Sequence, residues 1–140
     1  MDSIHVEIEL INACDQELVR RNHPEQKEVR RISVNACVAK KAIKTGITEK
    51  IQQVLQLPVV GKQMVRLTNN EVMECFKVGP LEVRFGESFT ICDALVLPDE
   101  EEPLLGLIAV WGMRLIIDPL TQQLIPDPRP SRLPAMRPVN

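Results

Sequence analysis

Alternating apolar and polar side chains predict two strands in the first forty residues. Residues 4–10, IHVEIEL, alternate with period two, which is typical of a strand with one buried face. A second alternating stretch covers 29–38 and leads into a segment that contains lysines. The polar segment between the two strands, 12–27, contains Asn22-His23-Pro24 and predicts a turn or loop.

One amphipathic helix and a series of short strands are predicted next. Apolar residues recur at helical spacing over 47–55, Thr48 can serve as the N-cap, and Pro58 ends the helix. Further strands are predicted at 63–68, 71–78, 80–86 and 88–97. The turns between these strands are indicated by Asn69-Asn70, Gly79-Pro80 and Gly86.

The last third of the chain continues this pattern of short elements. Residues 99–102, Asp-Glu-Glu-Glu, predict a solvated acidic loop, and 106–113 predict a short helix. Strands at 115–117 and 123–125 flank a turn in which Asp118 is expected to form an Asx turn or cap. The short strands and turns together predict an all-β fold, a small closed β-barrel with one or two short helices.

Composition supports one globular domain. The 140 residues are 44% hydrophobic and 26% charged, which is unlike a disordered chain. Aromatic residues make up only 3%, so the core is expected to consist of Val, Ile and Leu, which favours strands. Seventeen basic against nineteen acidic side chains give a net charge of −2, which argues against nucleic-acid binding through bulk charge.

Proline separates the C-terminal end of the chain from the rest. Five of the eleven prolines stand at positions 126, 128, 130, 134 and 138. We therefore expect a domain over 1–126 and a Pro/Arg-rich tail over 127–140 that is disordered or binds a partner. The arginines that make this tail a candidate recognition segment are Arg129, Arg132 and Arg137.

The cysteines and histidines form no motif for metal binding or nucleophilic catalysis. The four cysteines contain no CxxC pair; they are Cys14, Cys37, Cys75 and Cys92. Buried or half-buried thiols in a reducing cytosol are expected, with disulfides in an exported protein as the alternative. His5 and His23 lie in different segments, so no cysteine is expected to have a histidine beside it. No metal and no cofactor are expected.

Apolar runs are too short for a membrane-directed segment. Charged residues between Asp2 and Glu9 interrupt any apolar stretch that a signal peptide needs. The longest largely apolar run, 104–113, has about half the length that crosses a bilayer. We expect a cytoplasmic protein whose partners include neither nucleic acid nor membrane.

Five stretches of the chain, taken in order, carry a resemblance to a known protein family. They are VNACVAKKAIKTGITEKIQQVLQL (34–57), VRLTNNEV (65–72), ALVLP (94–98), Leu104-Leu105-Gly106 and LIIDPLTQQLIP (115–126). These stretches resemble the catalytic strand with its turn and helix, the flap, the next strand, the hydrophobic-hydrophobic-Gly motif and the closing strands of one family. That family is the bacterial single-domain retropepsin-like (clan AA) aspartic peptidases, and the resemblance, which covers 4–126, implies a homodimer.

The sequence departs from this family at the catalytic turn. Where the family has Asp-Thr-Gly-Ala, this chain has Ala39, Lys40, Lys41 and Ala42. The family's two aspartates, one from each protomer, share a proton and activate water, because like charges in contact force their pKa values apart. Alanine has no titratable atom, so the resemblance implies a degenerate peptidase with no catalytic residue.

A binding role is the alternative use of such a cleft. Lys40, Lys41 and Lys44 would give the former active-site mouth a positive field that accepts an acidic peptide, either the chain's own loop 99–102 or a partner's tail; solvated turn lysines are the plainer interpretation. The resemblance adds the residues at the flap tip as binding residues: Thr68, Asn69 and Asn70.

The predicted helix near residue 110 has no polar face. Ile108 and Trp111 are three residues apart and share one side, so they either belong to the protomer core or contact a second protomer or partner.

Two functions of different class follow. The favoured one is a non-catalytic retropepsin-like module that binds a peptide or protein, or acts as a scaffold, as a homodimer. The alternative is an active aspartic-type endopeptidase that uses another carboxylate, or the inactivated form of an active parent. Inactivation by design explains Ala39 but not the two lysines beside it.

Overall fold

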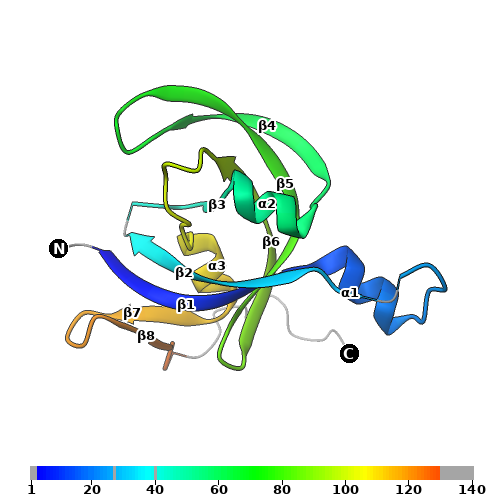
Figure 1. Cartoon of the computed structure of the whole chain (residues 1–140). Helices are drawn as coiled ribbons and strands as arrows, with labels where there is room; N and C mark the ends of the chain where they lie inside the picture. The colour runs from blue at the N-terminus through cyan, green and yellow to red at the C-terminus, as the bar shows by residue number, and fades with distance from the viewer. Residues whose placement is uncertain (1–2, 27, 40, 130–140) are drawn as a thin grey trace, which may run out of the picture.

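The computed structural model describes residues 3–26, 28–39 and 41–129. The chain is mostly β in this described part, as the sequence predicts, but it has three short helices where the sequence predicts one or two (Figure 1). The elements are β1 (Ser3–Asn12), α1 (Ala13–Arg20), β2 (Arg31–Ala39), β3 (Thr45–Thr48), α2 (Glu49–Leu55), β4 (Val59–Arg66), β5 (Val72–Phe85), β6 (Ser88–Leu97), α3 (Leu107–Gly112), β7 (Leu115–Asp118) and β8 (Gln123–Pro126).

The main sheet has the strand order β2-β1-β5-β6-β3, and β4 pairs with β5 outside this path. The β3–β6 pair is parallel and the other pairs are antiparallel. The predicted closure into a barrel is wrong, because β2 and β3, the two ends of the path, do not pair with each other. Residue Leu104 lies between them and forms isolated bridges with Cys37 on β2 and Gly46 on β3.

One long strand replaces two predicted ones. The segments 71–78 and 80–86 belong to the single strand β5, and Gly79-Pro80 forms an irregularity in the strand instead of a turn. The pairing register with β6 shifts between Val78 and Leu81, which is where proline, with no N–H to donate, is tolerated in a sheet. The β4–β5 hairpin arches over the rest of the molecule (Figure 1).

Aliphatic side chains form the core, as the composition predicts. Fully buried residues such as Leu10, Ile47 and Leu81 pack with the inner sides of α2 and α3, and each such side chain contributes about 1.5–3 kcal/mol by leaving water. A smaller cluster lies under the β4–β5 hairpin, where Cys75 and Leu97 pack against neighbouring strands. This second cluster packs the hairpin against Leu104 and the end of β6.

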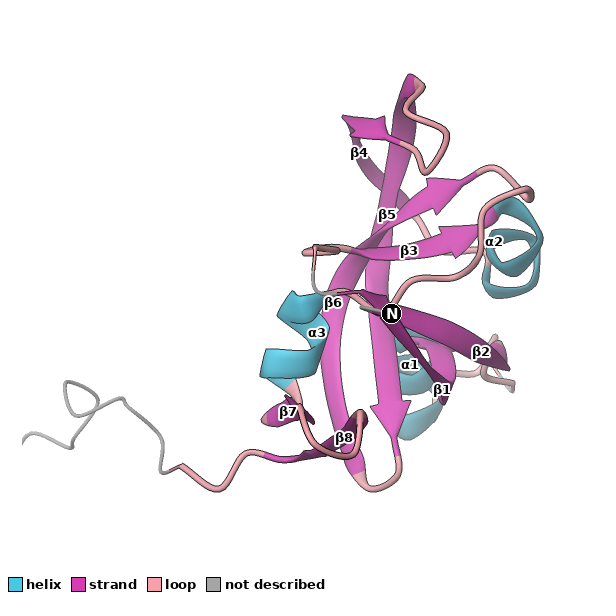
Figure 2. Ribbon diagram, turned by 90° about the vertical axis from the view of Figure 1, so that its left-hand side faces the viewer, coloured by secondary structure: helices cyan, strands magenta, loops and turns pink. Residues whose placement is uncertain are grey.

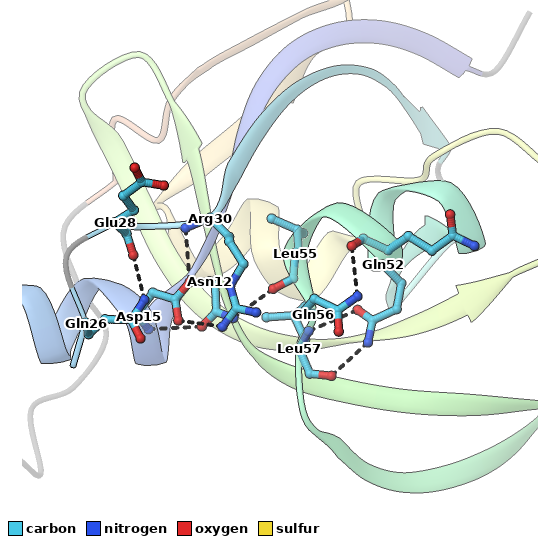
Figure 3. Close-up of polar contacts among 10 residues, drawn as sticks. Asn12, Asp15, Gln26, Glu28, Arg30, Gln52, Leu55, Gln56 and Leu57 are labelled. Carbon is cyan, nitrogen blue, oxygen red and sulfur yellow. Dashed lines mark hydrogen bonds and ion pairs between the residues drawn. The ribbon is translucent and has the colours of Figure 1, made fainter.

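The segment predicted as a turn or loop, 12–27, begins with the helix α1. The Asn12 side chain accepts a hydrogen bond from the Asp15 backbone N–H at 3.1 Å and donates one to the Leu55 carbonyl at 2.8 Å. The carboxylate of Asp15 pairs in turn with the Arg30 guanidinium, at 2.7 and 2.8 Å (Figure 3). These polar contacts stabilise a helix that has too few apolar residues to show a hydrophobic face in the sequence.

The remaining short elements follow the sequence prediction closely, with one addition. Thr48 caps α2, and its hydroxyl accepts from the Ile51 N–H at 3.4 Å. Asp118 forms the predicted turn between β7 and β8, where its carboxylate accepts from the Leu120 N–H at 3.0 Å. The short buried strand β3 was not predicted, because the alternation ends after Val38 and β3 is buried along its whole length.

The cysteine prediction is wrong at one position, and the tail prediction falls mostly outside the described residues. Cys14 is exposed on α1, whereas the other three cysteines are buried or half-buried. Burial raises the pKa of the Cys92 thiol to about 11 and also raises the pKa of the Cys75 thiol. Residues 130–140, which include Arg132 and Arg137, lie outside the described part, while Arg129 forms an ion pair with Asp127.

Candidate functional site

The turn that follows β2 is fixed by the start of α3. Ala42 donates its N–H to the Ala39 carbonyl, and the N–H groups of Leu107 and Ile108 bond to the carbonyls of Ala42 and Ile43. The first N–H groups of a helix have no partner within the helix. These bonds therefore give partners both to the first N–H groups of α3 and to the carbonyl groups of the turn. Figure 2 shows α3 below this region and the β4–β5 hairpin above it.

Gly106 permits the close contact between these segments. A Cβ atom at this position would lie 2.3 Å from the Lys44 carbonyl carbon and 2.5 Å from the Thr45 nitrogen. The Gly106 N–H also donates to the Thr45 hydroxyl at 3.1 Å. The Leu104-Leu105-Gly106 motif therefore sets the position of the backbone behind the turn.

Two hollows lie on either side of Leu104, which lines both of them. The first, which we call the acidic pocket, has a volume of about 430 Å³ and is lined by Cys37, Ala39, Thr68, Glu100, Glu101, Glu102 and Leu104. The second, the basic groove, has about 290 Å³ and runs between the turn and β4; its charged lining residues are Lys41, Lys44 and Arg66. Acidic side chains thus line the hollow at Ala39, and basic side chains line the hollow at the turn that follows it.

The predicted lysines differ in their surroundings. Lys40 lies outside the described residues. Lys41 is exposed and lines the basic groove, together with Ala42. Lys44 is half-buried in the same groove and lies 3.7 Å from the Asp93 carboxylate, which neutralises part of its charge.

The three predicted flap residues have separate roles. Thr68 lines the acidic pocket, and Glu101 accepts hydrogen bonds from its N–H at 3.0 Å and from its hydroxyl at 2.7 Å. Asn69 accepts from the Glu71 N–H, and Asn70 has a φ of 69°, so both form the hairpin turn. The structure does not bring Asn69 and Asn70 to either hollow.

The acidic loop, residues 99–102, lines the acidic pocket and not the basic groove. Asp99 accepts from the Lys50 N–H at the start of α2, at 3.0 Å, and Glu101 holds Thr68. Glu102 lies beside His5, with 3.2 Å between a carboxylate oxygen and the ring Nε2. The expectation that this loop fills the lysine-lined groove of its own chain is therefore wrong for the described residues.

Three of the alternative carboxylates, Asp93, Asp99 and Asp118, line neither the acidic pocket nor the basic groove. Asp118 lies in the β7–β8 turn, where hydrogen bonds from the Leu120 N–H and the Thr121 hydroxyl hold its pKa below its ordinary value. Asp93 faces Lys44, and Asp99 caps α2. These three carboxylates therefore have structural partners elsewhere, whereas Glu100, Glu101 and Glu102 line the acidic pocket together with Ala39.

The predicted contact residues on α3 are exposed. Ile108 is 47% exposed and Trp111 is 59% exposed, so the interpretation of both as core residues is wrong. Ile43 adjoins them, since its carbonyl accepts the Ile108 N–H, and it is 48% exposed. We call these three residues the α3 patch; it lies beside the turn that carries Lys41.

Sequence reasoning missed the approach of a histidine to a cysteine. In the antiparallel β1–β2 pair, His5 lies directly opposite Cys37, and Glu102 completes a group of three possible metal ligands. Only the strand register could have revealed this pair. The long segment between the two strands leaves that register undetermined in the sequence.

Comparison with known proteins adds no relative: no protein-family model matches the chain, and no curated protein matches its sequence. Within the described residues, helices are all too short or too polar to traverse a lipid bilayer.

Proposed function

We propose that this chain is a non-catalytic retropepsin-like protein that binds an acidic segment of a peptide or protein partner as a homodimer. The observation that carries the proposal is the basic groove, which is lined by Lys41 and Lys44 of the turn that follows Ala39, the alanine that replaces the catalytic aspartate. A groove with lysines and no acid–base pair is suited to hold an anionic chain without cleaving it.

The strand β4 gives this groove a way to hold an extended chain. Within the described residues β4 pairs only with β5, so the backbone groups on its other edge are available. Gln63 and Val65 line the groove from this edge, with Lys41 and Lys44 on the opposite side. A peptide added as a strand would gain backbone hydrogen bonds from β4, and the lysines would favour acidic side chains.

Dimer formation is supported by the α3 patch. Three exposed apolar residues on adjoining segments, one of them tryptophan, are typical of the centre of an interface. We expect Trp111→Ala to shift the chain from dimer to monomer in analytical ultracentrifugation. Leu120→Ala is the control, since Leu120 is 92% exposed in the β7–β8 turn and should leave the oligomeric state unchanged. A wild-type chain that sediments as a monomer at all concentrations would contradict the dimer.

Peptide binding is tested with a fluorescent, extended peptide rich in Asp and Glu. Anisotropy should show saturable binding that weakens as salt rises, because exposed charges are screened. Lys41→Glu should weaken this binding by about tenfold or more, whereas Lys50→Glu, an exposed lysine on α2, should leave it unchanged. Equal loss in both variants would mean that net charge, and not the groove, attracts the peptide.

Cleavage of unstructured proteins separates the proposal from an active peptidase. The non-catalytic protein should leave casein-like substrates intact at acid and neutral pH, with and without a pepsin-type inhibitor. Cleavage that the inhibitor blocks would overturn the proposal in favour of an active aspartic peptidase.

A further inference from the structure

A group of three metal-ligating side chains lies at the edge of the acidic pocket. His5, Cys37 and Glu102 each offer one ligand atom, and these atoms all lie within 4.8 Å of one another. Their types are an imidazole nitrogen, a thiol sulfur and a carboxylate oxygen. We propose that these three residues form a binding site for Zn²⁺, a function beyond the peptide binding proposed above.

The fold holds all three residues by backbone bonds. The β1–β2 register places His5 opposite Cys37, so both side chains project from the same face of the sheet. Glu102 directly precedes a segment that forms two backbone hydrogen bonds with Cys37. The Cys37 N–H donates to the Pro103 carbonyl at 2.9 Å, and the Leu105 N–H donates to the Cys37 carbonyl at 2.8 Å. The site is therefore built from two strands and an anchored loop.

The distances need only a small adjustment to suit tetrahedral zinc. His5 Nε2 lies 3.2 Å from a Glu102 oxygen, which is close to the separation of roughly 3.3 Å between two ligands that are each about 2.0 Å from zinc. A zinc–sulfur distance of about 2.3 Å requires roughly 3.5 Å between the sulfur and each of the other ligand atoms, and all three atoms already lie within 4.8 Å of one another. The exposed side chains of His5 and Glu102 can rotate to make this adjustment.

The chemistry of the ligands selects the ion. A thiolate and an imidazole favour Zn²⁺ over Mg²⁺ and Ca²⁺, which prefer sets made only of oxygen ligands. Cys37 and Glu102 line the acidic pocket, so a water molecule can occupy the fourth position from that side. Glu100 and Glu101 line the same pocket, and their negative charge favours entry of a cation.

The His5–Glu102 contact has little value for stability by itself. Its two side chains are 47% and 55% exposed, and a contact between such exposed groups adds little to stability because water screens it. A bound ion would instead join β1, β2 and the acidic loop, and it would stabilise the folded chain by binding to it alone. Zinc should therefore raise the melting temperature of the full chain.

The test is a titration of the chelator-treated full chain with Zn²⁺ in a calorimeter, and with Co²⁺ in an absorption spectrometer. We expect one ion per chain and a thiolate-to-cobalt charge-transfer band. Glu102→Gln and His5→Gln should weaken Zn²⁺ binding by about tenfold or more, and Cys37→Ser should abolish the band. The matched controls are His23→Gln and Cys14→Ser, which replace exposed residues outside the site and should bind as the wild type does.

Two results would overturn the site: no binding of Zn²⁺ by the wild-type chain, or equal binding by wild type and Glu102→Gln. Glu102 is exposed, so its variant is expected to fold even where Cys37→Ser does not. Lys41→Glu should leave zinc binding in place, because Lys41 lines the groove on the other side of Leu104. Failure of the zinc site and failure of the peptide-binding proposal are thus distinguishable.

Discussion

The side chain of Asp15 is 3% exposed, whereas the side chain of its partner Arg30 is 44% exposed. Burial alone would disfavour the charged carboxylate, but two side-chain hydrogen bonds from the guanidinium and one from the Arg30 N–H more than offset this cost. The hydrogen bonds from the Arg30 side chain are the largest cause that holds the pKa of Asp15 below its ordinary value. The pair joins α1 to the start of β2.

Asp15→Asn should lower the free energy of unfolding by about 2 kcal/mol at about pH 7, because the buried side chain at position 15 loses its charge-assisted hydrogen bonds from Arg30. A lowered folded-state pKa stabilises the fold above the unfolded value of about 4, and this contribution is lost as pH falls through the folded value. The difference between wild type and variant, measured by urea unfolding, should therefore shrink at about pH 3. A difference that stays the same at both pH values would contradict this account.

Gly106 lies so close to the backbone of residues 43–45 that it has no room for a side chain. Gly106→Ala would place a Cβ atom 2.3 Å from the Lys44 carbonyl carbon, and this neighbour is backbone that cannot rotate away. We expect the free energy of unfolding, measured with heat or urea, to fall by about 3 kcal/mol, which is the upper end of the usual cost of overpacking. Gly61→Ala on β4 is the control: no atom lies within 4 Å of a Cβ there, so its stability should be nearly unchanged.

At the scale of elements, local signals predict structure well where one residue decides the outcome. The sequence predicts Thr48 as a helix cap and Asp118 as a turn residue, because each acts on backbone groups two or three residues away. The helix α1 was missed although Asn12 caps it in the same way. Its stabilising partner, Arg30, comes from beyond the helix, and no periodicity in the sequence announces that contact.

Contacts that depend on register or on long-range pairing could not be predicted. The sequence predicts the turn at Ala39 and the lysines beside it. It does not predict the acidic pocket next to them. That pocket exists because Leu104 bridges both β2 and β3, whose pairing partners are set by tertiary packing. The approach of His5 to Cys37 has the same origin, since the strand register fixes it.

The bond between the acidic loop and the β4–β5 hairpin leads to a prediction about local stability. Glu101→Ala removes both hydrogen bonds from Thr68, so the hairpin tip should open more often. We expect the free energy of this local opening to fall by about 1 kcal/mol. Hydrogen exchange should become faster at the amides of Leu67 and Asn70, while the core strand β1 keeps its protection. Glu100→Ala, in the same loop, is the control. Unchanged exchange at the tip in both variants would show that the contact does not hold the hairpin.

At the scale of the whole molecule, the lysines of the turn make opposite contributions to the two proposed associations. A dimer formed around this turn would bring Lys41 of the two protomers close together, and like charges repel unless salt screens them. An acidic peptide in the basic groove is instead attracted by the same side chain, and salt weakens that attraction. We therefore expect the dimer to become tighter as ionic strength rises, and the bound peptide to become weaker.

Sedimentation and anisotropy measured over one range of salt concentrations test these opposite dependences. Lys41→Gln removes one charge from each protomer, so it should tighten the dimer at low salt and flatten the salt dependence of both associations. Lys62→Gln is the matched control, because Lys62 is exposed on β4 and its charge pairs with Glu74 at 3.6 Å on the same hairpin. If the dimer also weakens with salt in the wild type, the Lys41 side chains of the two protomers do not face each other, and the proposed repulsion between them is wrong.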